Sequence, residues 1–306
     1  MSVSGYVVMK YLYQRSCYIV FFVCFLLIAC APKVQEINAE NSLTGLLWKI
    51  SKSGFSDSYL FGTIHSDDER VIKLSAEIQH AFDSSPAVAL ELILDEAASK
   101  SVMAYMYFSD ANTLQNVIGD DLFKRSVEAL STKGMPEKMV DRMKPWAVFT
   151  ILNMPDNQSN TFLDAMLYDK ALKANKKVVG LETPMEQVNV FDGLSYDIQT
   201  QLLEKTLDQY TDMQKVMDEI IGIYLTRDLE KILAINEKYN RLMGKELAAI
   251  FNKRLLTDRN VRMMERMLPL LKEGQVFVGV GALHLPGKDG LIELLKQQDF
   301  VLEPVY

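Results

Sequence analysis

Short apolar segments lie near both ends of this chain, and a long stretch of helical pattern separates the two groups. Residues 46–50, 58–64 and 87–94 form the first group, and residues 275–281 and 300–306 form the second. Apolar runs of this length with turn residues between them are typical of buried strands. Strands so far apart in the sequence can bury their apolar faces together only in a shared sheet. We therefore expect one large domain rather than two smaller ones.

The middle of the chain, residues 94–273, repeats apolar side chains at helical spacing. One interruption, residues 177–183, is rich in β-branched side chains and ends before Pro184, so it predicts a further strand. Helical patterns at residues 69–82 and 289–297 connect the strands within each end group. These patterns predict an α/β (α+β) fold, in which two βαβ-like ends build a central mixed sheet and the large middle segment is mostly helical.

The first 29 residues have the composition of a lipoprotein signal peptide. Lys10 and Arg15 precede an apolar run of about 13 residues, which is shorter than the ~20 residues that a membrane-spanning helix needs. The run ends in Leu-Ile-Ala immediately before Cys30, which resembles a lipobox. We expect cleavage before Cys30 and lipidation of this cysteine. A plain secretory signal and an uncleaved anchor are the alternatives.

Cleavage would leave a short anchored tether and a folded domain. Residues 30–44 are mainly polar and lack an apolar period, so they predict a tether between the lipid and a domain at residues 45–306. Ala31 and Pro32 follow the cysteine without an aspartate, which favours the outer membrane. We therefore expect an exported protein that is held in the cell envelope by the lipid on Cys30 and faces the periplasm.

Charge and cysteine content exclude two classes of protein. The formal net charge is −7, and an acidic domain of this kind binds nucleic acid poorly. Cys17, Cys24 and Cys30 all lie in or directly after the predicted signal peptide. The mature domain is therefore not stabilised by disulfides, although it enters a compartment where disulfides form.

Two of the three histidines follow a glycine by three positions at the end of a predicted strand. The two motifs are Gly62-Thr63-Ile64-His65 and Gly281-Ala282-Leu283-His284. A glycine permits a close approach of the backbone, and the end of the strand brings the imidazole to the carboxyl edge of the sheet, where open α/β sheets bind ligands. A packed, hydrogen-bonded histidine is the alternative for each motif. The third histidine, His80, lies in a predicted helix, and we interpret it as structural because its spacing from His65 gives no ligand pattern.

Glu91 lies in the apolar run 87–94, and a buried carboxylate requires a compensating partner. It is therefore a metal ligand, a general base or the partner of a buried cation. Two imidazoles and one carboxylate, with positions left for water, form a recurring catalytic site for zinc and other divalent transition metals. His65, His284 and Glu91 are the candidate ligands, and we expect manganese, cobalt or zinc.

Two further charged residues are candidates for the site. Glu182 lies at the end of the predicted strand 177–183. There it can accept a hydrogen bond from a histidine ligand without binding the metal itself, or it can cap the helix that follows. Arg259 lies within a helical pattern. Its functional interpretation is the stabilisation of an anion that forms during catalysis, and its structural alternative is an ion pair on a solvated face.

These residues, taken together, resemble the TraB/GumN/Tiki family. The resemblance extends over residues 45–306 and rests on both glycine–histidine motifs, Glu91, the segment 180–183 and the pair Arg259-Asn260 with the methionines that follow it. Lys144-Pro145-Trp146 and Leu163-Asp164 also match residues of the family. The chain departs from the family at Phe162, where glycine is frequent, and at Ser66-Asp67-Asp68. These departures concern the shape of the substrate site and change none of the candidate ligands.

The resemblance implies a fold like that of the erythromycin-esterase and ChaN-like proteins. It also implies a metal-dependent protease site formed by His65, His284 and Glu91, with a role in that site for Arg259. Our leading hypothesis is a cell-envelope hydrolase that needs a divalent metal and acts on a peptide bond. The first alternative is a ChaN-like module that binds haem, metal or a peptide without turnover, and the second is a structural lipoprotein with a degenerate site. The substrate, a peptide or a small molecule, stays open.

Overall fold

A computed structural model describes residues 43–93, 96–154, 162–209 and 213–306. The predicted signal peptide at 1–29, Cys30 and most of the predicted tether lie outside the described residues. Within the described ranges, no helix is both long enough and apolar enough to cross a membrane.

Six strands form one mixed sheet, in the order β4-β3-β5-β2-β1-β6. The neighbouring pairs β4–β3, β3–β5 and β5–β2 are parallel, whereas β1 is antiparallel to both β2 and β6. This arrangement confirms the predicted α/β fold with a central mixed sheet. The strands are β1 (Leu47–Ser51), β2 (Ser58–Thr63), β3 (Ala87–Leu92), β4 (Lys177–Glu182), β5 (Val276–Gly281) and β6 (Val301–Pro304).

The two ends of the chain interleave instead of lying side by side. β5 lies between β2 and β3, and β6 lies at the far edge of the sheet, so neither end forms a βαβ unit with adjacent strands. The sequence predicts a single helix over residues 69–82, but the structure has two helices there, α2 (Glu69–Ile72) and α3 (Ala76–Ser84). The break has a local cause, because the side chain of Ser75 accepts a hydrogen bond from the Ile78 amide and starts a new helix there.

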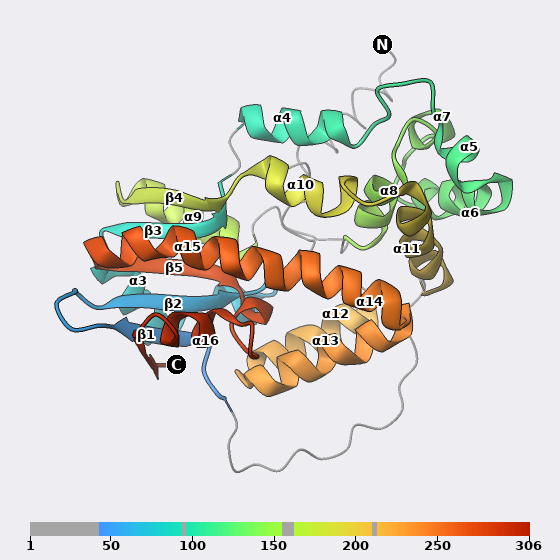
Figure 1. Ribbon diagram of the computed structural model, residues 1–306. Coiled ribbons are helices and arrows are strands. Elements are labelled where there is room, and N and C mark those ends of the chain that lie inside the picture. Colours follow the sequence, from blue (N-terminus) through green and yellow to red (C-terminus); the bar gives the residue numbers. More distant parts are fainter. Residues whose placement is uncertain (1–42, 94–95, 155–161, 210–212) are drawn as a thin grey trace.

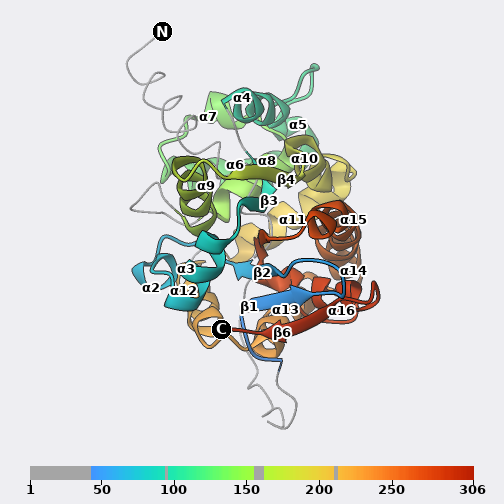
Figure 2. The ribbon, with the colours of Figure 1, turned by 90° about the vertical axis from the view of Figure 1, so that its left-hand side faces the viewer.

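Helices cover both faces of the sheet and form a second body beyond the ends of the strands (Figures 1 and 2). One hydrophobic core surrounds the sheet, and the other lies among the helices of the middle segment and includes Leu92 at the end of β3. The remaining helices are α4 (Glu96–Tyr105), α5 (Leu114–Ile118), α6 (Asp120–Ser131), α7 (Glu137–Val140), α8 (Pro145–Leu152), α9 (Leu163–Lys173), α10 (Pro184–Asp192), α11 (Tyr196–Gln209), α12 (Met213–Leu225), α13 (Leu229–Met243), α14 (Lys245–Asn252), the π-helical turn η4 (Lys253–Thr257), α15 (Asp258–Glu273), the short 3₁₀ turn η5 (Ala282–His284) and α16 (Leu291–Lys296).

Gly62 allows the two glycine–histidine segments to pack closely. It pairs with Val280 of β5, and a Cβ atom at Gly62 would lie 3.1 Å from the Cα of Ala282 and from a methyl group of Leu285. The carbonyl of Gly62 also accepts a hydrogen bond of 2.9 Å from the buried hydroxyl of Tyr224. The glycine is therefore needed because η5 lies directly against β2.

We expect Gly62→Ala to lower the free energy of unfolding by about 1 to 3 kcal/mol, because the added methyl group overpacks this contact. Gly222→Ala is the matched control. Gly222 lies in α12, and a Cβ there would meet no atom within 4 Å, so alanine should stabilise the helix by about 0.5 to 1 kcal/mol. Urea denaturation of both variants measures the two effects, and destabilisation of equal size in both would contradict the explanation.

Candidate metal centre

Four parallel strands bring the predicted site residues to one edge of the sheet. Glu91 lies in β3 one residue before Leu92, which pairs with Glu182 at the end of β4. On the other side of β3, Gly281 ends β5 and pairs with Thr63 at the end of β2. His65 and His284 follow these two strand ends, so five residues meet at this edge of the sheet: His65, Glu91, Glu182, Gly281 and His284.

His284 is fully buried at the end of η5, and its neighbours determine which ring nitrogen carries the proton. Its Nδ1 lies 2.5 Å from the Oδ1 of Asn260. The amide nitrogen of Asn260 donates to the carbonyl of Asp289 at 2.7 Å, so the Asn260 oxygen must face the imidazole. Nδ1 of His284 therefore carries a proton, and Nε2 holds the lone pair. This Nε2 lies 3.5 Å from Oε1 of Glu91.

The surroundings of His284 keep its ring neutral. Burial lowers the pKa of His284, and the positive charge of Arg259 and the nearby His65 lower it further. These effects outweigh the attraction of Glu91, so the pKa falls from 6.5 to about 3. At neutral pH the ring is a neutral imidazole, which is the form that binds metals.

Glu91 is buried, and both of its carboxylate oxygens are held. The amide of Gly281 donates to Oε1 at 2.6 Å, and the guanidinium of Arg259 donates to Oε2 at 2.7 Å. A Cβ on Gly281 would lie 3.2 Å from Oε1, so the glycine of the second motif permits this close approach.

The surroundings of Glu91 keep its carboxylate ionised. Burial alone raises its pKa, but Arg259, His284, His65 and the Gly281 amide together lower it to about 2. Of the three roles predicted for Glu91, the contacts show the partner of a buried cation, because Arg259 binds the carboxylate. The roles of metal ligand and general base stay predictions.

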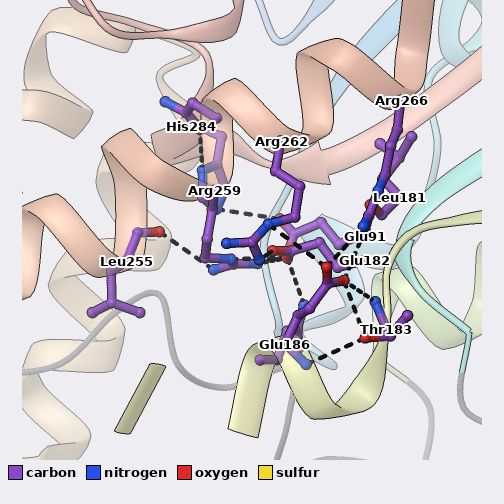
Figure 3. Close-up of polar contacts among 12 residues, drawn as sticks. Glu91, Leu181, Glu182, Thr183, Glu186, Leu255, Arg259, Arg262, Arg266 and His284 are labelled. Atoms are coloured by element: carbon purple, nitrogen blue, oxygen red, sulfur yellow. Dashed lines mark hydrogen bonds and ion pairs between the residues drawn. The ribbon is translucent and has the colours of Figure 1, made fainter. Parts of the chain in front are cut away.

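Arg259 lies in α15 and is 1% exposed, so the alternative of an ion pair on a solvated face was wrong. Its guanidinium binds Glu91 at 2.7 Å and Glu182 at 2.7 and 2.8 Å (Figure 3). The π-helical turn η4 directly precedes α15. The predicted stabilisation of a substrate anion by Arg259 stays a prediction, because the described contacts of its guanidinium are with the protein.

Glu182 holds Arg259 and not an imidazole. Its hydrogen-bond partners are Arg259, Arg262 at 3.0 Å and Gln187 at 3.1 Å. The helix after β4 is capped by Thr183, which exchanges hydrogen bonds with Glu186 in a capping box, so Glu182 does not serve as the cap either. Glu182 is therefore linked to the candidate ligand Glu91 through Arg259, which binds both carboxylates.

His65 is paired with Asp164, which lies in the first turn of α9. Nδ1 of His65 lies 3.1 Å from one carboxylate oxygen of Asp164, and the Thr63 hydroxyl donates to the other oxygen at 2.8 Å. Burial lowers the pKa of His65, but the charge and hydrogen bonding of Asp164 outweigh burial and raise it above 6.5. In the sequence, Asp164 stands out only through the family resemblance. The signal in the sequence itself was an acid at the start of an apolar helix.

The candidate ligands are close enough to shift one another's pKa, because His65 and His284 both act on Glu91. Nevertheless, no group of three His, Cys, Asp or Glu side chains in the described ranges is already arranged to hold a metal ion. His80 lies exposed on α3 and takes part in none of the contacts described above. The edge thus contains one histidine–glutamate pair and a second histidine held by its own acid.

We expect Arg259→Ala to lower the free energy of unfolding by about 3 to 5 kcal/mol, because it leaves the buried carboxylate of Glu91 without its arginine and Glu182 with Arg262 alone. Arg266→Ala is the matched control on the same helix. Arg266 is 40% exposed and pairs with Glu186, so its loss should cost at most about 1 kcal/mol. Equal costs for the two variants in urea denaturation would show that the buried arginine has no special structural role.

Acid should destabilise the metal-free protein through His284. The unfolded chain binds a proton near pH 6.5 and the folded protein only near pH 3, so stability is lost as the pH falls through that window. Around pH 5 to 6 we expect the free energy of unfolding to fall by about 1.4 kcal/mol per pH unit from this group. The raised pKa of His65 changes the free energy of unfolding only above pH 6.5. It therefore does not contribute to the loss of stability that His284 causes at lower pH. Urea denaturation of wild type and His284→Gln tests this, since identical slopes would exclude His284 as the cause.

The chain is similar to proteins that are named metalloproteases. The chain is 23% identical over 319 residues to the metalloprotease TIKI2 of Danio rerio, across 87% of this chain and 62% of that protein. It is 24% identical over 325 residues to the metalloprotease TIKI2 of Xenopus tropicalis, across 89% of this chain and 61% of that protein. The chain therefore spans about three fifths of the length of these relatives.

A bacterial relative matches over nearly its whole length. An uncharacterized protein of Treponema pallidum is 22% identical over 309 residues, across 90% of each chain. No solved structure matches the protein. The model of the TraB/PrgY/gumN family matches residues 46–304, which include every candidate ligand. The chain therefore belongs to the TraB/PrgY/gumN family and is a distant homologue of the TIKI metalloproteases.

Proposed function

We propose that this protein is a divalent-metal hydrolase of the cell envelope that cleaves a peptide bond. One observation carries the proposal: the Nε2 lone pair of neutral His284 faces an oxygen of ionised Glu91 at 3.5 Å. Two facing acceptors repel each other unless a cation lies between them. Two ligand atoms that each lie about 2.1 Å from a tetrahedral zinc ion are about 3.4 Å apart, so the pair has the spacing of metal ligands.

His65 completes the proposed ligand set. The carboxylate of Asp164 beside Nδ1 favours a proton on that nitrogen, so Nε2 is the atom that would coordinate. Asn260 does the same for His284. Histidine ligands in metalloproteins are commonly held in this way by an oxygen acceptor on the second ring nitrogen. The proposed ligands are His65, Glu91 and His284, and the donor set suits zinc, cobalt or manganese.

A bound divalent metal would supply an acidified water and would polarise a substrate carbonyl. The protein's own contribution is to keep its ligands in the required charge state. Arg259 and the Gly281 amide hold Glu91 as a carboxylate, and burial holds His284 neutral. Nε and Nη2 of Arg259 bind the two glutamates, and Nη1 lies 3.5 Å from the carbonyl of Leu255. We propose that its main role is to position Glu91.

Two further arguments support the substrate class and the location. Relatives over most of the chain are named metalloproteases, which favours a peptide bond as the target. The predicted signal peptide with Cys30 favours a protein that is lipid-anchored in the cell envelope, facing the periplasm.

The test is elemental analysis of the full-length protein after loading with zinc, manganese or cobalt. We expect metal close to one equivalent in the wild type and its loss in a His65→Ala, His284→Ala double variant. His80→Ala is the matched control, since it removes the remaining histidine of the chain at an exposed position on α3 and should keep its metal. A peptide-library screen of the metal-loaded protein then tests hydrolysis.

Metal content that is the same in the wild type and the double variant would contradict the proposed ligands. A haem absorption band in protein from haem-supplied cells, without a bound transition metal, would instead support the module that binds without turnover. The absence of both metal and haem would favour the structural lipoprotein.

A further inference from the structure

The proposed ligands are almost closed off from solvent, and the differences in exposure indicate where a substrate enters. Glu91 is 1% exposed and His284 is 0% exposed, whereas His65 is 6% exposed. Arg259 is as buried as Glu91. Of the three proposed ligands, His65 therefore keeps the largest exposed fraction.

Phe162 lies against the His65 ring. The two ring centroids are 5.6 Å apart at an interplanar angle of 70°, an edge-on contact, and Phe162 is 3% exposed. Its neighbours hold it there, because the amide of Leu163 donates to the carbonyl of Ser66 at 3.3 Å and Asp164 pairs with His65. The start of α9 thus fixes both the charge partner of His65 and the aromatic ring beside it.

We infer that Phe162 is a specificity-determining residue whose ring occupies the space that a substrate side chain would fill next to His65. The inference rests on the proposed function. His65 is the most exposed of the three proposed ligands, and a phenyl ring already takes up the volume beside it. The preferred substrates are therefore peptides with a small residue next to the cleaved bond, and bulky side chains are excluded.

The alternative is that Phe162 only fills the hydrophobic core among the helices of the middle segment, in which it also packs. The two roles predict different results when the ring is removed. A cavity lined by apolar side chains stays dry and takes up aromatic molecules of matching size. If that cavity opens beside the metal, an aromatic metal ligand should bind in it, whereas a cavity elsewhere in the core should leave such binding unchanged.

The test compares two hydroxamates on the cobalt-loaded, full-length protein. Acetohydroxamate and benzohydroxamate bind metals through the same atoms and differ by a phenyl group. We expect Phe162→Ala to bind benzohydroxamate at least about tenfold tighter than the wild type does, with acetohydroxamate changed by less than about threefold. The cobalt absorption spectrum follows both titrations. Phe162→Leu, which keeps apolar bulk, should fall between the wild type and Phe162→Ala.

Phe123→Ala is the matched control, because Phe123 packs in the same core from α6. It should bind both hydroxamates as the wild type does. Unchanged benzohydroxamate binding in Phe162→Ala would overturn the inference, as would an equal gain in Phe123→Ala. Loss of cobalt from Phe162→Ala, with cobalt retained by the wild type and Phe162→Leu, would also overturn it, since the ring would then maintain the site itself. A wild type that binds none of cobalt, zinc and manganese would instead refute the proposed function.

Discussion

The fold depends on a buried charge that the sheet cannot neutralise by itself. Glu91 lies in an apolar strand, and its cation, Arg259, comes from a helix 168 residues further along the chain. The same guanidinium binds Glu182 at the end of β4. A single arginine therefore fastens α15 to two neighbouring strands, and each carboxylate depends on this helix for the cation that offsets the cost of its burial.

The two imidazoles at this edge are held in the same manner but by partners of different charge. Asp164 is an acid and raises the pKa of His65, whereas Asn260 is neutral and allows burial to lower the pKa of His284. Two histidines of similar local sequence thus differ in how readily they take up a proton. A metal that binds both would compete with a proton mainly at His65.

Local patterns in the sequence predicted the strands, the glycine–histidine pairs and the buried Glu91, because these depend on the apolar period and on strand ends. The position of β5 between β2 and β3 could not be predicted in this way, because strand order is decided by packing over the whole domain. Asp164 and Asn260 were missed as partners for a similar reason. Both residues lie in helices. The spacing of apolar residues along a helix shows which of its faces is buried, but it does not show which histidine that face will contact.

The central place of β5 also determines when the sheet can form. β1 with β2 and β4 with β3 are two separate groups of strands, and the first carries His65 while the second carries Glu91. β5 joins them, and it begins only at Val276 of a 306-residue chain. Pairing between segments so distant in sequence is slow. A chain that grows from its N-terminus therefore cannot close this sheet or assemble the candidate metal centre until residues 276–284 have been made, long after the strands that carry His65 and Glu91.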